Sequence, residues 1–265
     1  MSFVELDLRL PREAFAPSEI ARAGALWRLL QDAAVRGSSA LGWPPERYVA
    51  EQCAFVVRRM VVTHHRSPRF GEPLPTATWV SSMRRDTFTT REIRVSSPEG
   101  PVVSTTQSWV HVAAPSLRPG RASRALLDAL AVEDRAPSVA LPEPTPAEGP
   151  EHRWSFATWH TWMDPLAHAN HPAYVDWADE ALAQRMSEAG IDPHAIEPVA
   201  EDLLFRSGVV APERVTVATQ LVGTSPDDPE VAVVRVAVLG GDDRVCAEGT
   251  VWRRGVLAAL TPPSA

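Results

Sequence analysis

The sequence of 265 residues contains no lysine and a single asparagine, Asn170, so arginine supplies all 26 basic side chains. This bias is typical of GC-rich coding sequences and predicts a bacterial source. Cysteine is almost as scarce: Cys53 and Cys246 fit no metal-ligand spacing, so we expect two reduced thiols in a cytoplasmic protein. Because the sequence also lacks a Gly-rich phosphate loop, a zinc-ligand pattern and a GxSxG motif, we predict no cofactor and no bound metal.

Long apolar runs are missing too, since no stretch approaches the roughly 18 consecutive residues of a membrane span. The N-terminal residues MSFVELDLRLPREAF alternate apolar and charged side chains and lack the pattern of a signal peptide, which again favours a cytoplasmic location. The net charge of −7 argues against nucleic acid or an anionic membrane as a partner. With 45% hydrophobic and 22% charged residues, the composition is that of an ordinary globular protein.

What the sequence does contain is one structural plan, repeated. A strand-like segment, an amphipathic helix and four β-like runs are predicted at residues 3–10, 18–36, 54–63, 74–82, 86–96 and 101–113. After a connector with five prolines, residues 136–150, the same order returns at residues 153–159, 172–188, 197–206, 213–224, 230–239 and 243–253. We therefore predict an α+β fold of two units, residues 1–135 and 151–265, each with a helix packed on a curved antiparallel sheet.

Polar side chains crowd the start of the second predicted helix, in the stretch DPLAHANHPAYVDWADEAL that begins at Asp164. Pro172 suits the first turn of a helix, which places Asn170 or His171 at the cap. The N–H groups of a first helical turn carry about half a positive charge and suit an oxyanion. A nearby Asp164 can attack a bound carbonyl carbon or activate water, while His168 orients that water or protonates a leaving group.

Each of these residues also has a simpler explanation. Asp164 can be a turn residue beside a proline, His168 a packed side chain, and Asn170 only a helix cap. Tyr174 and Trp177 lie three residues apart on the apolar face of the helix, so we expect both in the core.

The spacing of these residues resembles a hotdog thioesterase signature: an Asp four residues before a His, then His-x-Asn, and a Tyr six residues after the His. Here these are Asp164, His168, Asn170 and Tyr174. The DP dipeptide also resembles the aspartate loop of 4-hydroxybenzoyl-CoA thioesterases. The N-terminal half is similar to plant and bacterial acyl-ACP thioesterases, in LLQDAAV, FVVRRMVVTHHRSPRFGE, TATWVSSMRRD and QSWVHV. This resemblance, over most of residues 3–253, implies a tandem double hotdog fold.

The resemblance also implies a function, which is hydrolysis of an acyl thioester of acyl carrier protein or CoA in fatty-acid or polyketide metabolism. It implies that residues 151–265 carry the active site, with Asp164, His168 and Asn170 as catalytic residues and His171 as a second choice. Residues 1–135 would hold the acyl chain and supply the pairing of hotdog units, so a monomer or a homodimer is expected. Other hotdog enzymes have a catalytic carboxylate in the middle of a helix, which makes Asp32 another second choice.

An acidic carrier protein needs basic contacts on this chain. Arginine suits phosphate and acidic helices because its guanidinium is planar and donates two parallel hydrogen bonds. We consider three segments for this contact, Arg58–Arg59, Arg84–Arg85 and Arg253–Arg254.

Two positions depart from the plant enzymes. Leu166 stands where they have an Asn between the Asp and the His, and Gly208-Val209 stand where they have a Glu-Cys pair. Part of the plant catalytic set is therefore absent, while the simpler aspartate-based set is present. Two other functions stay open: a hotdog dehydratase or cyclase that acts on polyketide thioesters, and a non-catalytic acyl-carrier binding protein.

Overall fold

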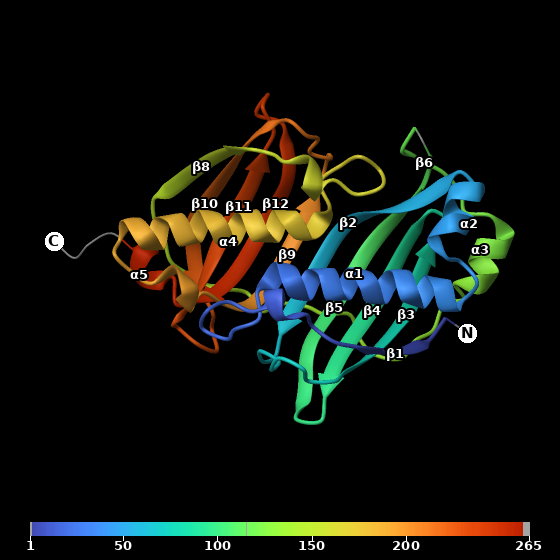
Figure 1. The fold of residues 1–265 in the computed structure, drawn as a ribbon, viewed down its shortest axis with the longest axis horizontal. Helices are drawn as coiled ribbons and strands as arrows, with labels where there is room; N and C mark the ends of the chain where they lie inside the picture. The colour runs from blue at the N-terminus through green and yellow to red at the C-terminus, as the bar shows by residue number, and fades with distance from the viewer. Residues whose placement is uncertain (1, 115, 262–265) are drawn as a thin grey trace. The chain divides into compact units, whose positions relative to one another are not determined.

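The chain divides into two units in the computed structural model, which describes residues 2–114 and 116–261 (Figure 1). Unit 1 contains the chain up to Arg12 and Leu26–Ala140, and unit 2 contains Glu13–Ala25 and the chain from Leu141 onward. Residues 13–25 thus group with unit 2, although they precede most of unit 1 in the sequence. One reason is a hydrogen bond of 2.7 Å from Ser18 Oγ to the carbonyl oxygen of His194.

Unit 1 is an antiparallel sheet packed against one long helix. Its strands run in the spatial order β1 (Val4–Leu8), β3 (Leu74–Arg84), β4 (Phe88–Ser97), β5 (Gly100–Ala113) and β2 (Cys53–His64), and the short β6 (Arg118–Pro119) pairs with β5. Helix α1 (Ala23–Ala40) crosses these strands in Figure 1 and buries Leu26, Trp27 and Leu30. The 3₁₀ turn η1 (Arg12–Ala14) and the short helices α2 (Pro45–Ala50) and α3 (Arg124–Ala129) complete this part of the chain.

Gly37 lets α1 approach the sheet closely. A Cβ atom at this position would lie 2.6 Å from Cγ2 of Thr78 on β3 and 3.0 Å from Nη1 of Arg91 on β4. Glycine inside a helix costs about 1 kcal/mol relative to alanine. At this position the close helix–sheet contact offsets that cost, because any larger residue would have to displace the side chain of Thr78 or Arg91.

Unit 2 repeats the plan of unit 1. Its strands run in the order β8 (Glu151–Ala157), β10 (Arg214–Thr224), β11 (Val231–Leu239), β12 (Val245–Arg254) and β9 (Glu197–Phe205), and β7 (Thr145–Pro146) also pairs with β10. Helix α4 (His171–Glu188) follows β8 in the chain as α1 follows β1. The 3₁₀ turns η2 (His160–Trp162) and η3 (Pro193–Ala195) and helix α5 (Leu257–Leu260) join these elements. The predicted repeat of strand, helix and meander is confirmed.

The proline-rich connector is extended and lies first along unit 1. Arg94 Nη2 donates to the carbonyl oxygen of Pro137 over 2.8 Å, and Ser138 Oγ donates to Glu92 Oε1 over 2.9 Å. Further along the chain, β7 joins the sheet of unit 2. Prolines suit such a segment because an extended chain outside the main ladder has few N–H groups to satisfy.

Unit 2 buries a cluster of charges between α4 and its sheet. Arg253 Nε lies 2.7 Å from Asp179 Oδ1, and Arg253 Nη1 lies 2.6 Å from Glu201 Oε1. Burial raises the pKa of Asp179, although Arg253 opposes the shift. The expectation that Arg253 contacts a carrier protein is wrong, because its guanidinium is 0% exposed and held by these two carboxylates.

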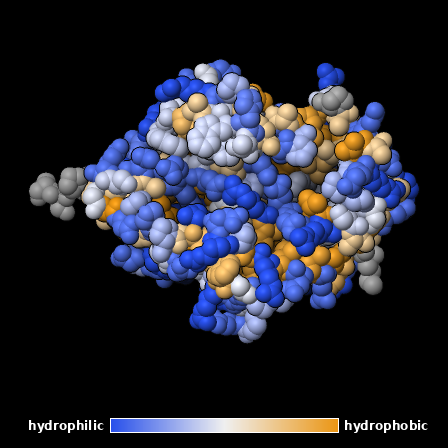
Figure 2. Space-filling view, in the orientation of Figure 1, coloured by the Kyte–Doolittle hydropathy of each residue, from blue (hydrophilic) through white to orange (hydrophobic). Residues whose placement is uncertain are grey.

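The surface shown in Figure 2 is mainly hydrophilic, with hydrophobic side chains in patches between the charged ones. Within residues 2–114 and 116–261, no helix is both long and apolar enough to cross a membrane. The same ranges contain no group of three or more His, Cys, Asp or Glu side chains placed to hold a metal ion. Cys53 and Cys246 are free thiols.

Candidate active site

The predicted site residues of unit 2 lie together on one tight loop, Met163–Asn170, which we call the aspartate loop. Its ends are joined by a β-bridge between Met163 and Ala169, and Asp164 N donates to the carbonyl oxygen of His168 over 2.7 Å. Ala167 has a φ of 60°, the left-handed conformation that lets the chain reverse within so few residues. The loop therefore has a fixed shape that its own backbone sets.

The Asp164 carboxylate takes part in this turn through one oxygen. Its Oδ1 accepts hydrogen bonds from the backbone N–H groups of Leu166 (2.8 Å) and His168 (3.3 Å). Among the residues that the structure describes, none donates to Oδ2. Asp164 is thus a turn residue, as its simpler explanation required, and it still has an oxygen available for chemistry.

Helix α4 begins where the sequence predicts. Asn170 occupies the N-cap and Pro172 lies in the first turn, but the Asn170 side chain makes no capping hydrogen bond. A helix cap is therefore not a sufficient explanation for Asn170. His171, the second choice beside it, packs edge-on against Phe205 with ring centroids 6.2 Å apart.

His168 lies directly against a second segment, residues 206–213, which we call the glycine loop. A Cβ atom on Gly208 would be 2.3 Å from His168 Cδ2 and 2.6 Å from Cγ, so the imidazole occupies the space of a side chain at 208. No residue in the described part of the chain forms a hydrogen bond with the imidazole nitrogens. The ring is held by packing, and both nitrogens can face a ligand or water.

The two loops are joined through Val209. Its carbonyl oxygen accepts from Ala169 N over 2.7 Å, and its N–H donates to the Tyr174 hydroxyl over 3.0 Å. Burial raises the pKa of Tyr174, although the hydrogen bond from Val209 opposes the shift, so the phenol stays neutral. Tyr174 and Trp177 are both buried, as predicted, and Tyr174 additionally fixes the glycine loop.

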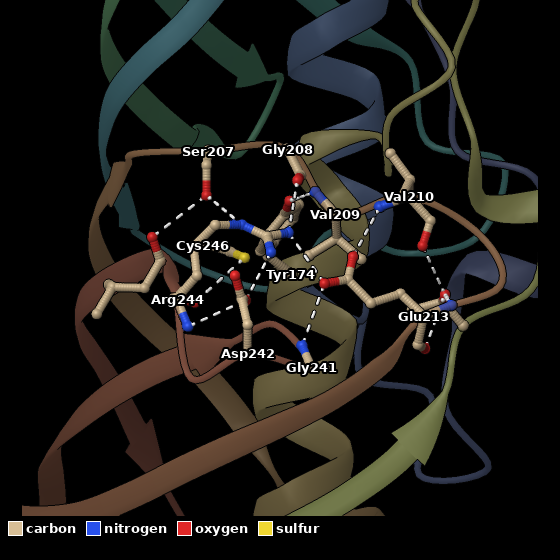
Figure 3. A network of polar contacts seen from close by, with 12 residues as sticks. Tyr174, Ser207, Gly208, Val209, Val210, Glu213, Gly241, Asp242, Arg244 and Cys246 are labelled. Atoms are coloured by element: carbon tan, nitrogen blue, oxygen red, sulfur yellow. Dashed lines mark hydrogen bonds and ion pairs between the residues drawn. The ribbon is translucent and has the colours of Figure 1, made fainter.

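Arg244 holds the other side of the glycine loop (Figure 3). Its Nε donates to Ser207 Oγ over 3.1 Å, and its Nη2 donates to the Gly208 carbonyl oxygen over 3.3 Å. Nη2 also lies 2.9 Å from Oε1 of Glu213, and Nη1 lies 2.7 Å from Oδ1 of Asp242. One guanidinium thus connects the backbone beside His168 to two carboxylates.

Glu213 closes this network by binding two backbone amides. Its Oε2 accepts from Val210 N and its Oε1 from Gly241 N, each over 3.1 Å. Desolvation opposes the ionised form, but these two hydrogen bonds and Arg244 lower the pKa of Glu213. The carboxylate is therefore charged at neutral pH and pins the far end of the glycine loop.

Aromatic side chains form a wall beside the aspartate loop. Trp159 stacks on Trp162 with centroids 5.0 Å apart and an interplanar angle of 11°, and Trp162 packs edge-on against Phe156 and Trp177. Trp159 is 64% exposed, an unusual state for a large apolar ring. The loop therefore has a polar part at Asp164 and His168 and a flat apolar part beside it.

Asp32 has different surroundings. It lies on α1, its carboxylate is 46% exposed, and it forms an ion pair of 2.8 Å with Arg36 one helical turn away. The structure thus brings Asp164, His168, Asn170 and His171 together in unit 2 and does not add Asp32 to that loop. No pattern in the sequence pointed to Arg244, to Glu213 or to the packing role of Gly208.

Comparison with known proteins bears on both units. Residues 17–129 match the family model of the acyl-ACP thioesterase N-terminal domain. The chain resembles the acyl-ACP thioesterases. That match lies mostly in unit 1 and ends before the aspartate loop, and no curated protein sequence matches the chain.

Solved structures of acyl-ACP thioesterases and a related enzyme cover nearly the whole chain. One from Lactobacillus plantarum, described as an oleoyl thioesterase, has a TM-score of 0.78 at 19% identity, over 98% of this chain and 97% of its own. The 12:0-ACP thioesterase of Umbellularia californica has a TM-score of 0.73 at 14% identity, over 96% and 98%. An acyl-ACP thioesterase of Bacteroides thetaiotaomicron has a TM-score of 0.71 at 12% identity, again over 96% and 98%. The predicted tandem double hotdog fold is confirmed.

The geometry explains one departure from the plant acyl-ACP thioesterases. The Glu expected in place of Gly208 cannot be accommodated while His168 keeps its observed position, because even a Cβ atom would overlap the imidazole ring. The neighbouring Val209 is 0% exposed and contributes backbone groups, so its side chain is not presented to a substrate. Any chemistry at this site therefore depends on the aspartate loop.

Proposed function

We propose that this chain hydrolyses acyl thioesters of acyl carrier protein to a free acid and a carrier thiol, with the active site at the aspartate loop of unit 2. One observation carries the proposal. Asp164 and His168 share a rigid loop directly before the N-terminus of α4, where the positive end of the helix dipole favours a developing negative charge. The family match in unit 1 and the structural likeness to acyl-ACP thioesterases support the same reaction.

The residues divide the reaction as follows. The thioester carbonyl docks at the N-terminus of α4, where the positive end of the helix dipole stabilises the developing oxyanion. Asp164, through its available Oδ2, takes a proton from water as the oxygen of that water bonds to the carbonyl carbon. The C–S bond then breaks, and the leaving thiolate receives a proton from His168 or from the protonated Asp164. Asn170 orients the loop and the bound carbonyl.

The two units have separate tasks in this proposal. The unit built largely from residues 1–135 holds the acyl group, residues 136–150 connect the units, and residues 151–265 carry the chemistry. Arg58 and Arg59 on β2 and Arg84 and Arg85 at the turn between β3 and β4 are all exposed, so both pairs remain candidates for a contact with an acidic carrier. The free thiols Cys53 and Cys246 support a reducing compartment.

Asp164→Asn is the decisive test. The asparagine keeps an Oδ1 that accepts from Leu166 and His168, so the loop stays folded, and the change removes only the charge. We expect turnover of acyl-ACP, measured as thiol release, to fall by roughly 10²–10⁴ with little change in KM. Circular dichroism checks that the variant is folded.

Asp32→Asn is the matched control. It is the same substitution on an exposed, ion-paired carboxylate of α1, and we expect unchanged turnover. If Asp32→Asn abolishes activity while Asp164→Asn retains it, the proposed site is wrong. If the wild type releases no thiol from any acyl-ACP or acyl-CoA, hydrolysis itself is wrong, and product masses then distinguish a dehydratase or cyclase from a binding protein.

A further inference from the structure

Unit 1 buries an arginine that has no carboxylate partner. Arg91 on β4 is 5% exposed and reaches under the C-terminal end of α1, where it donates to Thr78 Oγ1 (3.1 Å) and Ser38 Oγ (3.0 Å). Both partners are neutral, and no carboxylate among the described residues forms an ion pair with Arg91. Desolvation lowers the pKa of Arg91 to about 10, so the guanidinium is still charged at neutral pH.

The adjacent carboxylate on the same strand cannot serve Arg91. Successive residues of a strand point to opposite faces of the sheet. Glu92 therefore faces away from α1, where it accepts hydrogen bonds from Thr106 (2.6 Å), Ser138 (2.9 Å) and Arg94 (3.1 Å). Sheet residues and the connector thus occupy this carboxylate on the outer face, and no carboxylate among the described residues pairs with Arg91 on the inner face.

Two more polar groups lie next to Arg91 on the inner face. Gln107 on β5 is directly opposite Arg91 in the sheet register, a position with Cβ atoms about 4.5–5.5 Å apart. Gln107 is 0% exposed; its Oε1 accepts from Trp109 Nε1 over 3.0 Å, and its Nε2 has no partner in the described residues. Thr105, two residues along the same strand, is also 0% exposed, and its hydroxyl has no described partner.

An unpaired buried charge beside unsatisfied donors is costly for a folded protein. Removing a charge from water is unfavourable unless the charge is paired, and a buried donor without a partner loses its hydrogen bonds to water without replacement. The same chain balances its other buried arginine, Arg253, with two carboxylates. The donors at Arg91, Gln107 and Thr105, which we call the polar cluster, have no carboxylate acceptor among the residues that the structure describes.

We propose that the polar cluster of unit 1 binds an acceptor oxygen on the acyl group of the substrate, and that a carboxylate matches it best. This inference rests on the proposed function, because it gives unit 1 the acyl group. It predicts that the enzyme prefers acyl chains that carry an oxygen acceptor over plain alkyl chains. The guanidinium, the amide N–H and the hydroxyl all donate hydrogen bonds to oxygen acceptors. A plain alkyl chain accepts none, so its binding would desolvate these donors without compensation.

Matched acyl-ACP thioesters test the proposal. Octanoyl, dodecanoyl and hexadecanoyl chains are each compared with the same chain carrying a terminal carboxylate and with the same chain carrying a ketone on the penultimate carbon. We expect kcat/KM to favour an oxygen-bearing chain by roughly 10- to 100-fold, the ratio that a hydrogen bond to a charged group supplies. A preference for the carboxylate over the ketone supports the proposal, and a kcat/KM for the plain alkyl chain that equals or exceeds that of both oxygen-bearing chains overturns it.

Two variants separate this role from a structural one. Arg91→Met has a similar volume and should remove the preference, and Thr105→Val, which deletes only an unpartnered hydroxyl, should reduce it with no loss of stability. Arg36→Met is the control, because it removes a positive charge from the exposed face of α1 in the same unit. If Arg91 serves only to support Ser38 at the end of α1, Arg91→Met lowers Tm and leaves the preference unchanged, which overturns the proposal.

A binding measurement that needs no hydrolysis tests this inference separately from the proposed function. Dodecanedioate should raise the Tm of the wild type and of Arg36→Met, and it should raise the Tm of Arg91→Met much less. Equal shifts in all three proteins overturn the inference even where thioesters are hydrolysed. A loss of the shift in Arg91→Met together with no thiol release from any substrate supports the binding site and refutes hydrolysis.

Discussion

Gly208→Ala should damage the active site by moving His168. The added Cβ would lie 2.3 Å from His168 Cδ2, whereas ordinary contacts begin near 3.4 Å, so one of the two groups must move by about 1 Å. The glycine loop is held by Arg244, Tyr174 and Glu213, while the imidazole makes no described hydrogen bond. We therefore expect the ring to move and the loop to stay.

A displacement of about 1 Å in a catalytic group typically costs about 10² in rate. Turnover in a thiol-release assay should thus fall about 100-fold, with KM nearly unchanged because binding groups elsewhere are untouched. Stability should change little, since Gly208 is exposed and does not adopt a left-handed conformation that would strain an alanine. The expected defect is catalytic and not a folding defect.

Gly241→Ala is a matched control in the same network. A Cβ there would lie 3.4 Å from the Arg214 carbonyl oxygen, an ordinary contact, and the Gly241 N–H would still bind Glu213. The double variant Gly208→Ala/His168→Ala should be no slower than His168→Ala alone, because the glycine acts only through the ring. Full activity in Gly208→Ala, or additive losses in the double variant, would refute this account of His168.

Two further predictions concern the groups that hold the glycine loop. Tyr174→Phe removes the acceptor of the buried Val209 N–H and should lower the free energy of unfolding by about 1–3 kcal/mol. Chemical denaturation measures this loss, and Val49→Ala at an exposed position is the control that should leave stability unchanged. Acid should loosen the glycine loop, because folding lowers the pKa of Glu213. The ionised Glu213 carboxylate therefore stabilises the folded protein above its unfolded-state pKa, and this stabilisation is lost as the pH falls through its folded-state pKa. Hydrogen exchange at Val210 and Gly241 should therefore accelerate in that range, and an identical acid response in Glu213→Gln would contradict the assignment.

The aspartate loop could be predicted from the sequence because its parts are consecutive. The spacing of Asp164, His168 and Asn170, followed by Pro172, describes a turn and a helix start that depend on local chemistry alone. The repeated strand and helix patterns were readable for the same reason. The start of α1 was harder to predict. The sequence pattern predicts a helix from residue 18, but Glu19 has a φ of 62° and the helix begins at Ala23.

The glycine loop could not be predicted, because its contacts join residues that are distant in sequence. Arg244 is 36 residues from Gly208, and Tyr174 is 35 residues from Val209. Only the tertiary fold, with β9 paired to β12, β11 between β12 and β10, and α4 packed on the sheet, brings them together. The error at Arg253 has another cause: adjacent residues on a strand face opposite sides, so Arg253–Arg254 could not both be surface contacts.

The close contact between His168 and Gly208 bears on the absence of the plant Glu-Cys pair at positions 208 and 209. A side chain at position 208 and the observed imidazole position exclude each other, so a site with Glu-Cys at these positions requires a different placement of its histidine. Replacing Gly208 by Glu in this chain would therefore displace His168 without rebuilding the plant set. The aspartate loop keeps its own shape through Asp164 Oδ1 and needs no side chain from the glycine loop, which contributes backbone only. The proposed mechanism therefore confines the chemistry to one short segment of unit 2, and changes at Gly208 should act through the position of His168.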